Sequence, residues 1–580
     1  MRRRAFLRGL ALGGAAVASG CLRGEAQTSP SPSASPSAIA SVTPLTTPSP
    51  APTVEPADWN ALRAALRDGL VRSGDATYDA ARVLYNTRFD GVRPQAVARC
   101  ATTEDVRECV RFARAYGIPL ALRSGGHSYA GWSTGAGLVV DVGRMSAIDV
   151  QSDRVTVGAG ARLIDLYDAV AARGQGVPAG SCASVGVTGL TLGGGMGVLS
   201  RAWGLTCDDL VAAQVVTADG QVRDCDEARD ADLFWALRGG GGGSFGVVTS
   251  LTLRTHPATA LAIGFLSWPW SRAAAVVSAW QVWMSRAPDA LWSTLHLQTG
   301  AQGPEATMHA VLTGTASDLA SRFDTLVAGA GAPIYREQGV RTYRDVMLLE
   351  AGCLGRSIEQ CHLVGTTPAG VLGRETYVAK SAVAKQPLPD AAIAALVGAI
   401  ESIAGRQGVG GGAVLLDSLG GAVSRVAPSA TAFAHRDAFA VAQFIASWNA
   451  AGPASVADYR PIETRERKIK KRDAGKEMTL RLTENPDILK AIVAARRAGA
   501  IVVGFKAETG DATTEAGRML REKKLDLVVA NDVSDPGSAF GSDTDRVTFV
   551  SADGVEALPL LAKTEVARRL VAKLAERLAR

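Results

Sequence analysis

The stretch "RSGGHSYAGWS", residues Arg123 to Ser133, decides how this chain is interpreted. It follows the apolar run "PLAL", which is typical of a strand, and it places a histidine and a tyrosine directly after two glycines. Glycine has no Cβ, so its backbone can approach a ligand closely and adopt positive φ. The stretch therefore predicts a loop that is built for close contact with a ligand.

Two further loops share this glycine-rich character, "GLTLGGGMG" at residues 189–197 and "RGGGGGSFG" at residues 238–246. Such loops suit a pyrophosphate, because their amides can surround it. The last loop also spells G-x-G-x-x-G (Gly241, Gly243, Gly246) and G-x-S-x-G (around Ser244). Both motifs require a helix to follow, whereas "VVTSLTLRT" alternates like a strand. The sequence therefore disfavours a Rossmann domain and a hydrolase nucleophile elbow.

The elements around these loops predict a mixed α and β body. Thr102 and Asp105 fit a capping box at the start of "TTEDVRECVRFARAYG", in which apolar residues recur near helical spacing. "RLIDLYDAVAARG" reads as a second helix that ends at Gly174, and "GLVVDVG", "RVTVGAG" and "GVVTSLTLRTH" read as strands.

Composition limits the kinds of partner. The chain has 580 residues, 47% hydrophobic content and a net charge of +6, which predicts two to four domains. Its first three quarters lack a basic stripe with interleaved aromatics, so we expect no nucleic-acid partner. None of the eight cysteines forms a C-x-x-C pair, and we expect no metal site. Cys353 and Cys361 fit either a local disulfide or two buried thiols.

The N-terminal residues 1–21 carry Arg3-Arg4, a short apolar run and Cys21, and they resemble a twin-arginine signal with a lipoprotein box. The apolar run is too short to span a bilayer. A Ser/Thr/Pro-rich linker, residues 22–57, follows. We expect an exported, extracytoplasmic protein that contacts the membrane only through a lipid anchor at Cys21. The alternative is a chance cysteine beside an ordinary cleavage site.

"RSGGHSYAGWS", "PAGSCASVGVTGLTLGGGMGVLSRAWGLTCDDLV" and "DLFWALRGGGGGSFGVVTSLTLRTHP" together resemble the FAD-binding domain of berberine-bridge-enzyme-like oxidases, over residues 93–257. The resemblance implies an α+β fold. It comprises a PCMH-type FAD-binding domain of two α/β subdomains (residues 58–261) and a substrate domain, an antiparallel sheet backed by helices (residues 262–450).

The resemblance also implies bicovalent FAD, joined through the 8α-methyl to His127 and through C6 to Cys182. The other implied cofactor contacts are Arg123, Ser124, Gly125, Gly126, Ser128, Gly186, Gly189, Gly193, Gly194, Gly195, Gly246 and Val248. The alternatives are a buried thiol at Cys182 and a solvent-facing histidine at position 127.

Tyr129 matches a family tyrosine beside the flavin, and we expect it to position or help deprotonate a substrate hydroxyl. The alternative is a packing tyrosine. Val185 matches a position linked to oxygen access, which weakly favours an oxidase. Leu190 stands where some plant members carry a histidine.

Five tryptophans of the substrate domain allow either sugar stacking or core packing, and packing is the favoured interpretation: Trp268, Trp270, Trp280, Trp283 and Trp292. The plant enzymes carry a catalytic glutamate before the equivalent of His435-Arg436. The aligned stretch "SRVAPSATAFAHR" holds no acid, so the sequence leaves the base unassigned.

Residues 455–580 do not continue the oxidase pattern. They resemble the C-terminal half of phosphopantothenoylcysteine synthetase, through "ADYRP", "KIKK", "NPDI", "GFKAET" and "LDLVVANDVS". This partial α/β segment implies a nucleotide-ribose contact at Asp458 and a phosphate contact at Lys468; the alternative for the lysine-rich run is a solvated face. The family's nucleotide-binding first half is missing upstream, which favours a fusion, recombination or assembly error over a bifunctional enzyme.

The sequence as a whole predicts an FAD-linked oxidase that takes a hydride from an alcohol or sugar hydroxyl and passes the electrons to oxygen. The alternatives are a flavin dehydrogenase with another acceptor, a ligase-like fusion fragment without activity, and a body that binds flavin but is catalytically dead.

Overall fold

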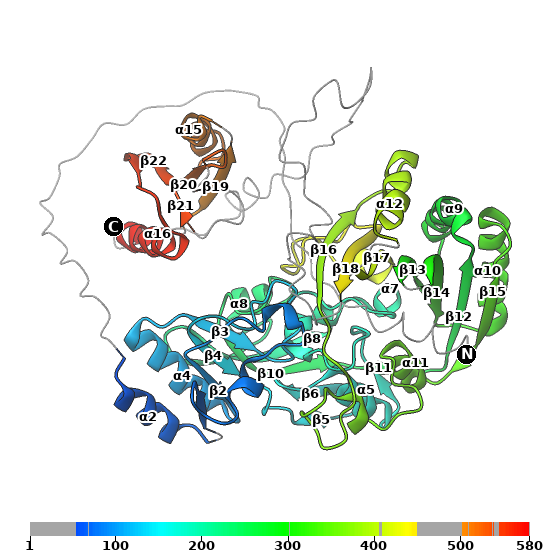
Figure 1. The fold of residues 1–580 in the computed structure, drawn as a ribbon, viewed down its shortest axis with the longest axis horizontal. Helices are drawn as coiled ribbons and strands as arrows, with labels where there is room; N and C mark the ends of the chain where they lie inside the picture. Colours follow the sequence, from blue (N-terminus) through cyan, green and yellow to red (C-terminus); the bar gives the residue numbers. More distant parts are fainter. Residues whose placement is uncertain are drawn as a thin grey trace, which may run out of the picture. The chain divides into compact units, whose positions relative to one another are not determined.

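The computed structural model describes residues 54–67, 69–300, 302–404, 409–448, 501–508, 510–535, 538 and 544–578. These residues belong to two compact units, one ending its described part at residue 448 and the other beginning at residue 501 (Figure 1). The predicted signal, nearly all of the linker, Asp458 and Lys468 lie outside the described residues. The two units are described one at a time.

The first unit begins with a four-stranded sheet in the order β1-β2-β4-β3. Its strands and helices are α2 (Pro56–Ala65), β1 (Leu70–Arg72), α3 (Tyr78–Arg82), β2 (Ala96–Arg99), α4 (Thr103–Tyr116), β3 (Leu120–Arg123) and β4 (Leu138–Asp141). The predicted capping box is confirmed, since Thr102 and Asp105 exchange side-chain bonds with each other's backbone amides at the start of α4. Strand β3 ends where the loop with His127 begins.

A five-stranded antiparallel sheet follows, in the order β5-β6-β10-β8-β9. Its elements are β5 (Ile148–Val150), β6 (Arg154–Gly158), α5 (Leu163–Ala171), α6 (Val187–Leu192), α7 (Ser200–Trp203), β8 (Leu210–Val216), β9 (Val222–Cys225), α8 (Ala231–Leu237) and β10 (Val247–Arg254). β7 (Gln175–Gly176) pairs with β11 (His256–Pro257). Because the third glycine loop leads into strand β10, it is neither a Rossmann turn nor a nucleophile elbow.

The remainder of the first unit is a seven-stranded antiparallel sheet, in the order β15-β12-β14-β13-β17-β18-β16 (Figure 1). Its elements are β12 (Leu261–Trp268), α9 (Ala273–Ser285), β13 (Leu291–Gly300), β14 (Gly303–Leu312), α10 (Ala316–Ala330), β15 (Tyr335–Arg341), α11 (Tyr343–Glu350), β16 (Tyr377–Ala384), α12 (Asp390–Ile403), β17 (Val409–Ser418), α13 (Ala422–Arg425) and β18 (Ala440–Trp448). Helices α9, α10 and α12 back one face of this sheet. The expected α+β fold is confirmed.

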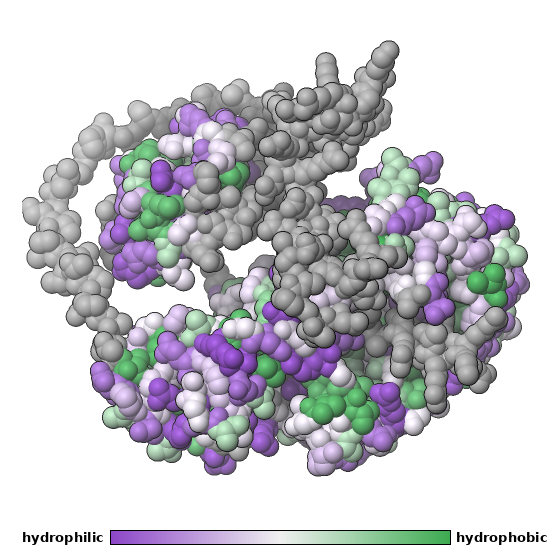
Figure 2. Space-filling view, in the orientation of Figure 1, coloured by the Kyte–Doolittle hydropathy of each residue, from purple (hydrophilic) through white to green (hydrophobic). Residues whose placement is uncertain are grey.

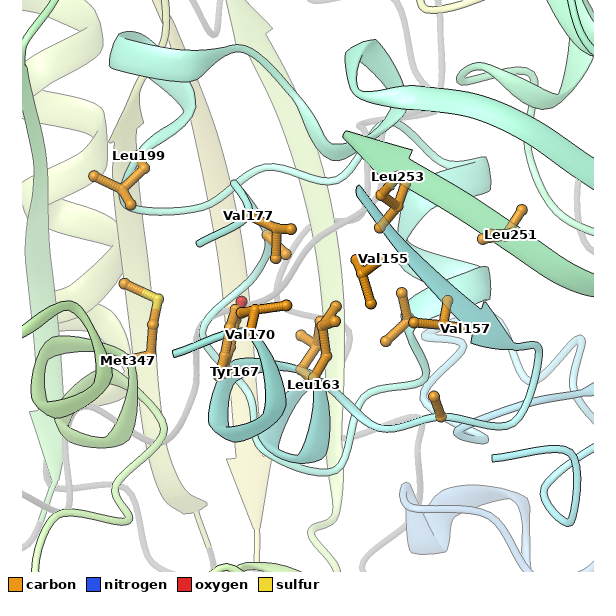
Figure 3. Packing of buried hydrophobic residues seen from close by; sticks show 14 of the residues in the cluster. Val155, Val157, Leu163, Tyr167, Val170, Val177, Leu199, Leu251, Leu253 and Met347 are labelled. Atoms are coloured by element: carbon orange, nitrogen blue, oxygen red, sulfur yellow. The ribbon is translucent and has the colours of Figure 1, made fainter. Parts of the chain in front are cut away.

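Two apolar clusters lie on the two faces of the large sheet. One packs the sheet against α9, α10 and α12. The other joins the opposite face to α5, α11 and the five-stranded sheet, and Figure 3 shows part of it around Leu163, Tyr167 and Val177. Four of the five substrate-domain tryptophans are buried, and Trp270 packs against the first cluster, as the packing interpretation expects. The sheet is therefore fixed on both sides.

The cysteine alternative is also resolved. Cys353 and Cys361 form a disulfide with their Cα atoms 5.9 Å apart, which closes a short loop after α11. Of the other cysteines that the structure describes, four are buried, and Cys182 is partly exposed.

The second unit carries a four-stranded sheet in the order β19-β20-β22-β23, whose first pair is parallel. Its elements are β19 (Val503–Glu508), α15 (Ala512–Glu522), β20 (Leu527–Asp532), β21 (Thr544–Asp545), β22 (Val547–Ser551), β23 (Gly554–Ala557), β24 (Leu561–Ala562) and α16 (Lys563–Leu578). It has its own small apolar clusters, one on each side of β20.

Polar residues dominate the coloured surface in Figure 2, with hydrophobic residues confined to separate areas. Across the described ranges, no helix is both long and apolar enough to cross a membrane.

Candidate active site

The loop with His127 is fixed at its base. The guanidinium of Arg123 donates to Asp141 Oδ2 at 3.0 Å and to the carbonyl of Ala81 at 2.6 Å. The hydroxyl of Ser124 donates to the carbonyl of Ala159 at 2.6 Å. Both side chains are thus bonded to the protein itself, and their part in a cofactor site stays a prediction.

The loop with Cys182 is held against the start of α5. The amides of Leu163 and Ile164 donate to the carbonyls of Val185 and Ala183 at 3.0 and 3.2 Å. A helix start has unbonded amides, and this loop satisfies two of them. The carbonyls of Ala183 and Val185, shortly after Cys182 in the chain, are thus bonded to α5.

The two loops touch each other through glycines. A Cβ on Gly125 would lie 2.2 Å from the Gly186 nitrogen, and a Cβ on Gly186 would lie 2.2 Å from Ser124 Oγ. Only glycine allows backbones this close. The sequence therefore brings the histidine loop and the cysteine loop together by removing side chains at their contact.

The imidazole of His127 has a defined environment. It stacks on the ring of Tyr85, with ring centroids 4.0 Å apart, and its Nε2 lies 3.0 Å from Ser184 Oγ. Burial, with a smaller contribution from the Arg162 charge, lowers the pKa of His127 to about 3. The ring is therefore neutral at physiological pH, the form in which imidazole is nucleophilic. The ring is part-buried and stacked on Tyr85, which does not fit the predicted alternative of a solvent-facing histidine.

Tyr85, Tyr129 and Tyr377 form a cluster of rings on which the Cys182 sulfur acts electrostatically. Tyr377 makes edge-on ring contacts with Tyr129 at 5.3 Å and with Tyr85 at 6.4 Å. Burial is the main cause that raises the pKa of all three hydroxyls above their usual range, and the nearby Cys182 sulfur adds to each shift. The thiol is thus close to Tyr85, which also stacks on His127.

Tyr129 is oriented from the large sheet. The side-chain amide of Gln443, on β18, donates to the Tyr129 hydroxyl oxygen at 2.7 Å. Gln443 is fully buried, and its Oε1 has no hydrogen-bond partner among the described residues. A buried amide oxygen without a partner is costly, which indicates that a bound group completes this site.

The other predicted cofactor residues lie along the same loops. Gly194 and Gly195 have φ of +115° and +85°, and Gly246 has φ of +142°. A Cβ on Gly189 would meet no atom of the described residues within 4 Å, whereas Val248 is buried in β10. Gly126 has φ of +69°, Gly193 ends α6, and the Ser128 hydroxyl accepts from the Trp132 amide at 3.1 Å. Their cofactor contacts stay predictions.

The face of the large sheet opposite α9, α10 and α12 carries polar residues. Alternate residues of a strand point to opposite faces, and Leu295, Met308 and Leu416 pack toward the helices. Thr294, His309 and Asp417 follow the opposite alternation, and Thr294 pairs directly with the other two across β13, β14 and β17. Burial raises the pKa of Asp417, and the charge of Asp417 in turn contributes to the raised pKa of Tyr129.

A cavity of about 50 Å³ lies beside this row. Ser181, next to Cys182 in the chain, lines one part of it, and His296, His309, Glu350 and Asp417 line another. His309 Nε2 lies 3.1 Å from Glu350 Oε2, and the rings of His296 and His309 meet edge-on at 5.8 Å. The cavity thus joins the cysteine loop to the acidic row of the sheet.

The sequence analysis missed Asp417, His309, Glu350 and Gln443. It looked for an acid between residues 424 and 436, whereas the part-buried Asp417 stands earlier, in "AVLLDS" on β17. The available signal was an aspartate within an apolar strand, since a strand in a sheet covered on both faces normally excludes charge.

The described residues of the site are compatible with bound FAD. The glycine contacts leave backbone at the loop surface, His127 is neutral, and the Gln443 oxygen needs a donor. His127 and Cys182 would hold the flavin, with the glycine loops along its phosphates.

Comparisons with known proteins agree. A family model described as "FAD binding domain" matches residues 94–226, and one described as "DNA/pantothenate metabolism flavoprotein C-terminal domain" matches residues 437–578. The uncharacterized FAD-linked oxidoreductase YgaK of Bacillus subtilis is 31% identical over 397 residues, covering 67% of this chain and 83% of the relative.

Two solved structures show the same fold. BBE-like 1 of Physcomitrella patens has a TM-score of 0.61 and 28% identity, over 67% of this chain and 84% of that one. The glucooligosaccharide oxidase of Acremonium strictum, whose structure is described as revealing a novel flavinylation, has a TM-score of 0.60 and 27% identity, over 69% and 84%. With its flavin loops and its matching sheet domain, this chain belongs to the berberine-bridge-enzyme-like family of FAD-linked oxidoreductases.

Proposed function

We propose that this enzyme oxidises an alcohol or sugar hydroxyl to the carbonyl compound, with oxygen as the acceptor and hydrogen peroxide as the second product. One observation carries the proposal: a part-buried carboxyl, Asp417, lines a cavity together with Ser181 of the cysteine loop, and its charge acts on Tyr129. Removal of hydride from a C–H bond is easier when the adjacent O–H loses its proton, and this pair is suited to that task.

The cofactor is proposed to be bicovalent, through His127 and Cys182. Support comes from the neutral, part-buried imidazole, which stacks on Tyr85, and from the electrostatic effect of Cys182 on the same tyrosine. Once bound there, FAD supplies two-electron chemistry, accepting the hydride and passing both electrons to oxygen.

Asp417 is proposed as the proton acceptor for the substrate hydroxyl. Its pKa is raised by burial, toward the range in which a base works best near neutral pH. Tyr129 is proposed to position the same oxygen, because Gln443 on the sheet donates to the tyrosine hydroxyl and so orients it.

The choice of oxygen rests on Val185, a small residue beside the cysteine loop at the position that the family links to oxygen access. The twin-arginine and lipoprotein features of residues 1–21 support export of the folded, flavin-loaded enzyme and anchoring at Cys21. We assign no ligase step to the C-terminal domain, whose Asp458 and Lys468 lie outside the described residues.

The test is substrate-driven bleaching of the oxidised flavin band without oxygen, over a panel of primary alcohols and mono- and oligosaccharides. The proposal expects bleaching, then recovery with one peroxide per turnover when air is admitted. Bleaching that only a dye reverses would replace the oxidase by a dehydrogenase. A flavin that no alcohol or sugar bleaches would overturn the proposed reaction.

A further inference from the structure

The titratable residues that line the cavity beside Asp417 are acids and imidazoles. Glu350 and Asp417 are its acids, and His296 and His309 are its imidazoles. Among the described residues that line it, none is lysine or arginine. Burial, followed by the neighbouring His309, lowers the pKa of His296 to about 3, so this ring brings no positive charge at neutral pH.

Glu350 is only half satisfied. It is 3% exposed, its Oε2 contacts His309, and its Oε1 has no hydrogen-bond partner among the described residues. A buried carboxylate with an unpaired oxygen carries a desolvation cost that a structural role does not explain. Such a group in a cavity beside the reacting centre is a candidate for ligand binding.

The position of Glu350 in its helix adds to this cost. It is the last residue of α11, where the helix dipole disfavours negative charge. The helix gains nothing from a glutamate at this end, whereas a positively charged ligand group in the cavity would offset both the dipole and the burial.

We propose that the substrate of this site carries a protonated amine, which binds at the Glu350 carboxyl group while the reacting hydroxyl lies at Asp417. The inference rests on the proposed alcohol oxidation and narrows its substrate class to amino alcohols and amino sugars. It also assigns a positioning role to His309, which fixes the glutamate by contact with Oε2.

Size and hydrogen-bond pattern fit an ammonium group. A cavity of about 50 Å³ holds a few water-sized groups, so it accommodates a –CH2–NH3+ end but excludes a second ring. An ammonium offers three donors and one positive charge, and the cavity offers carboxylate acceptors on both the helix and the sheet. A neutral hydroxyl in the same place would supply one donor and no charge.

The experiment compares matched ligands on the flavin-loaded enzyme at neutral pH and constant ionic strength. One pair is glucosamine and glucose, and the other is 4-(aminomethyl)benzyl alcohol and 4-methylbenzyl alcohol. Dissociation constants come from the change in the oxidised flavin spectrum, and rates come from anaerobic bleaching. We expect the amine of each pair to bind at least about tenfold more tightly, the scale of a charge-assisted hydrogen bond.

The decisive variant is Glu350→Gln, which keeps the size of the side chain but removes its charge. The ratio of the dissociation constants of the neutral ligand and the amine should fall toward one in both pairs. Glu305→Gln, an exposed position on β14 that bonds to Gln298, is the matched control and should keep the preference. His309→Gln should weaken the preference partially, and recovery of flavin content and melting temperature shows that each variant is folded.

The outcomes separate the two proposals. Tight amine binding that depends on Glu350 supports the ammonium site, whether or not the flavin bleaches. Bleaching of both members of a pair at equal affinity upholds alcohol oxidation and overturns the ammonium site. An amine preference that survives Glu350→Gln also overturns it.

Discussion

The two sides of the active site are built in opposite ways. On the side of residues 123–133 and 181–195, glycines remove side chains where the two loops touch, and the loops carry the imidazole and the thiol that we propose as flavin attachments. On the sheet side, Asp417, His309 and Gln443 present side chains from regular strands. In the proposed function the loops hold the flavin, whereas side chains of the sheet select and deprotonate the substrate.

The largest effect should come from Asp417→Asn. If the sheet side carries the chemistry, loss of the proton acceptor should lower the rate of anaerobic flavin reduction by about 10²–10⁴-fold. Flavin content should stay at the wild-type level. Asp437→Asn, an exposed residue paired with Lys385, is the control. If Asp417→Asn reduced the flavin at the wild-type rate, the base would lie on the loop side, and the sheet would not carry the proposed chemistry.

Gly186→Ala tests the loop side. The added methyl would meet Ser124 Oγ at 2.2 Å and the Gly125 nitrogen at 2.5 Å, so the two loops must separate. We expect a loss of about 1–3 kcal/mol in stability, seen as a lower melting temperature, together with reduced flavin content. Gly398→Ala, in α12, where a Cβ would meet no described atom within 4 Å, should be neutral or slightly stabilising. Full flavin content in Gly186→Ala would show that the close contact is dispensable.

Tyr129→Phe should have a smaller effect, because it removes one hydroxyl contact and keeps the ring packed on Tyr377. Loss of one hydrogen bond to the reacting oxygen corresponds to about a tenfold slower flavin reduction. Gln443→Glu provides a second test, since it disturbs the donor to Tyr129 without removing the tyrosine. Unchanged reduction rates in both variants would make Tyr129 a packing residue.

The smallest effect concerns stability and pH. Burial raises the pKa of Asp417, so above the unfolded value, about 3.9, the folded state binds more protons than the unfolded state. The free energy of unfolding of the wild type therefore falls as pH rises toward the pKa of Asp417 in the folded state. Asp417→Asn has no carboxyl at this position, so its free energy of unfolding does not fall for this reason. The melting temperature of the variant minus that of the wild type should increase from about pH 4 to pH 8. A difference that is flat or reversed would mean that Asp417 is not desolvated.

The same contrast explains what the sequence revealed. Backbone constraints appear as glycines in the sequence, so the three loops could be found from the sequence alone, whereas the roles of His127 and Cys182 came from the family resemblance and stay predictions. The capping box of α4 and the strand after the third loop were also predicted correctly.

The sheet side was hidden for a physical reason. Asp417 contacts its neighbours across three strands, and Glu350 comes from a helix 41 residues away from His309. Neither has a local spacing that marks it, and only strand register and helix packing bring them into one cavity. From the sequence, the only stretch that could be considered for the base was therefore residues 424–436, which align with the region of the plant enzymes' glutamate.

The central claim is that His127 and Cys182 both hold one flavin, and intact-mass analysis of the denatured protein tests it most directly. The account predicts a polypeptide that carries the mass of one FAD after denaturation, in the wild type and in each single variant, His127→Ala and Cys182→Ala. The double variant should show the mass of the bare chain. A wild-type chain that releases its FAD on denaturation would contradict the account.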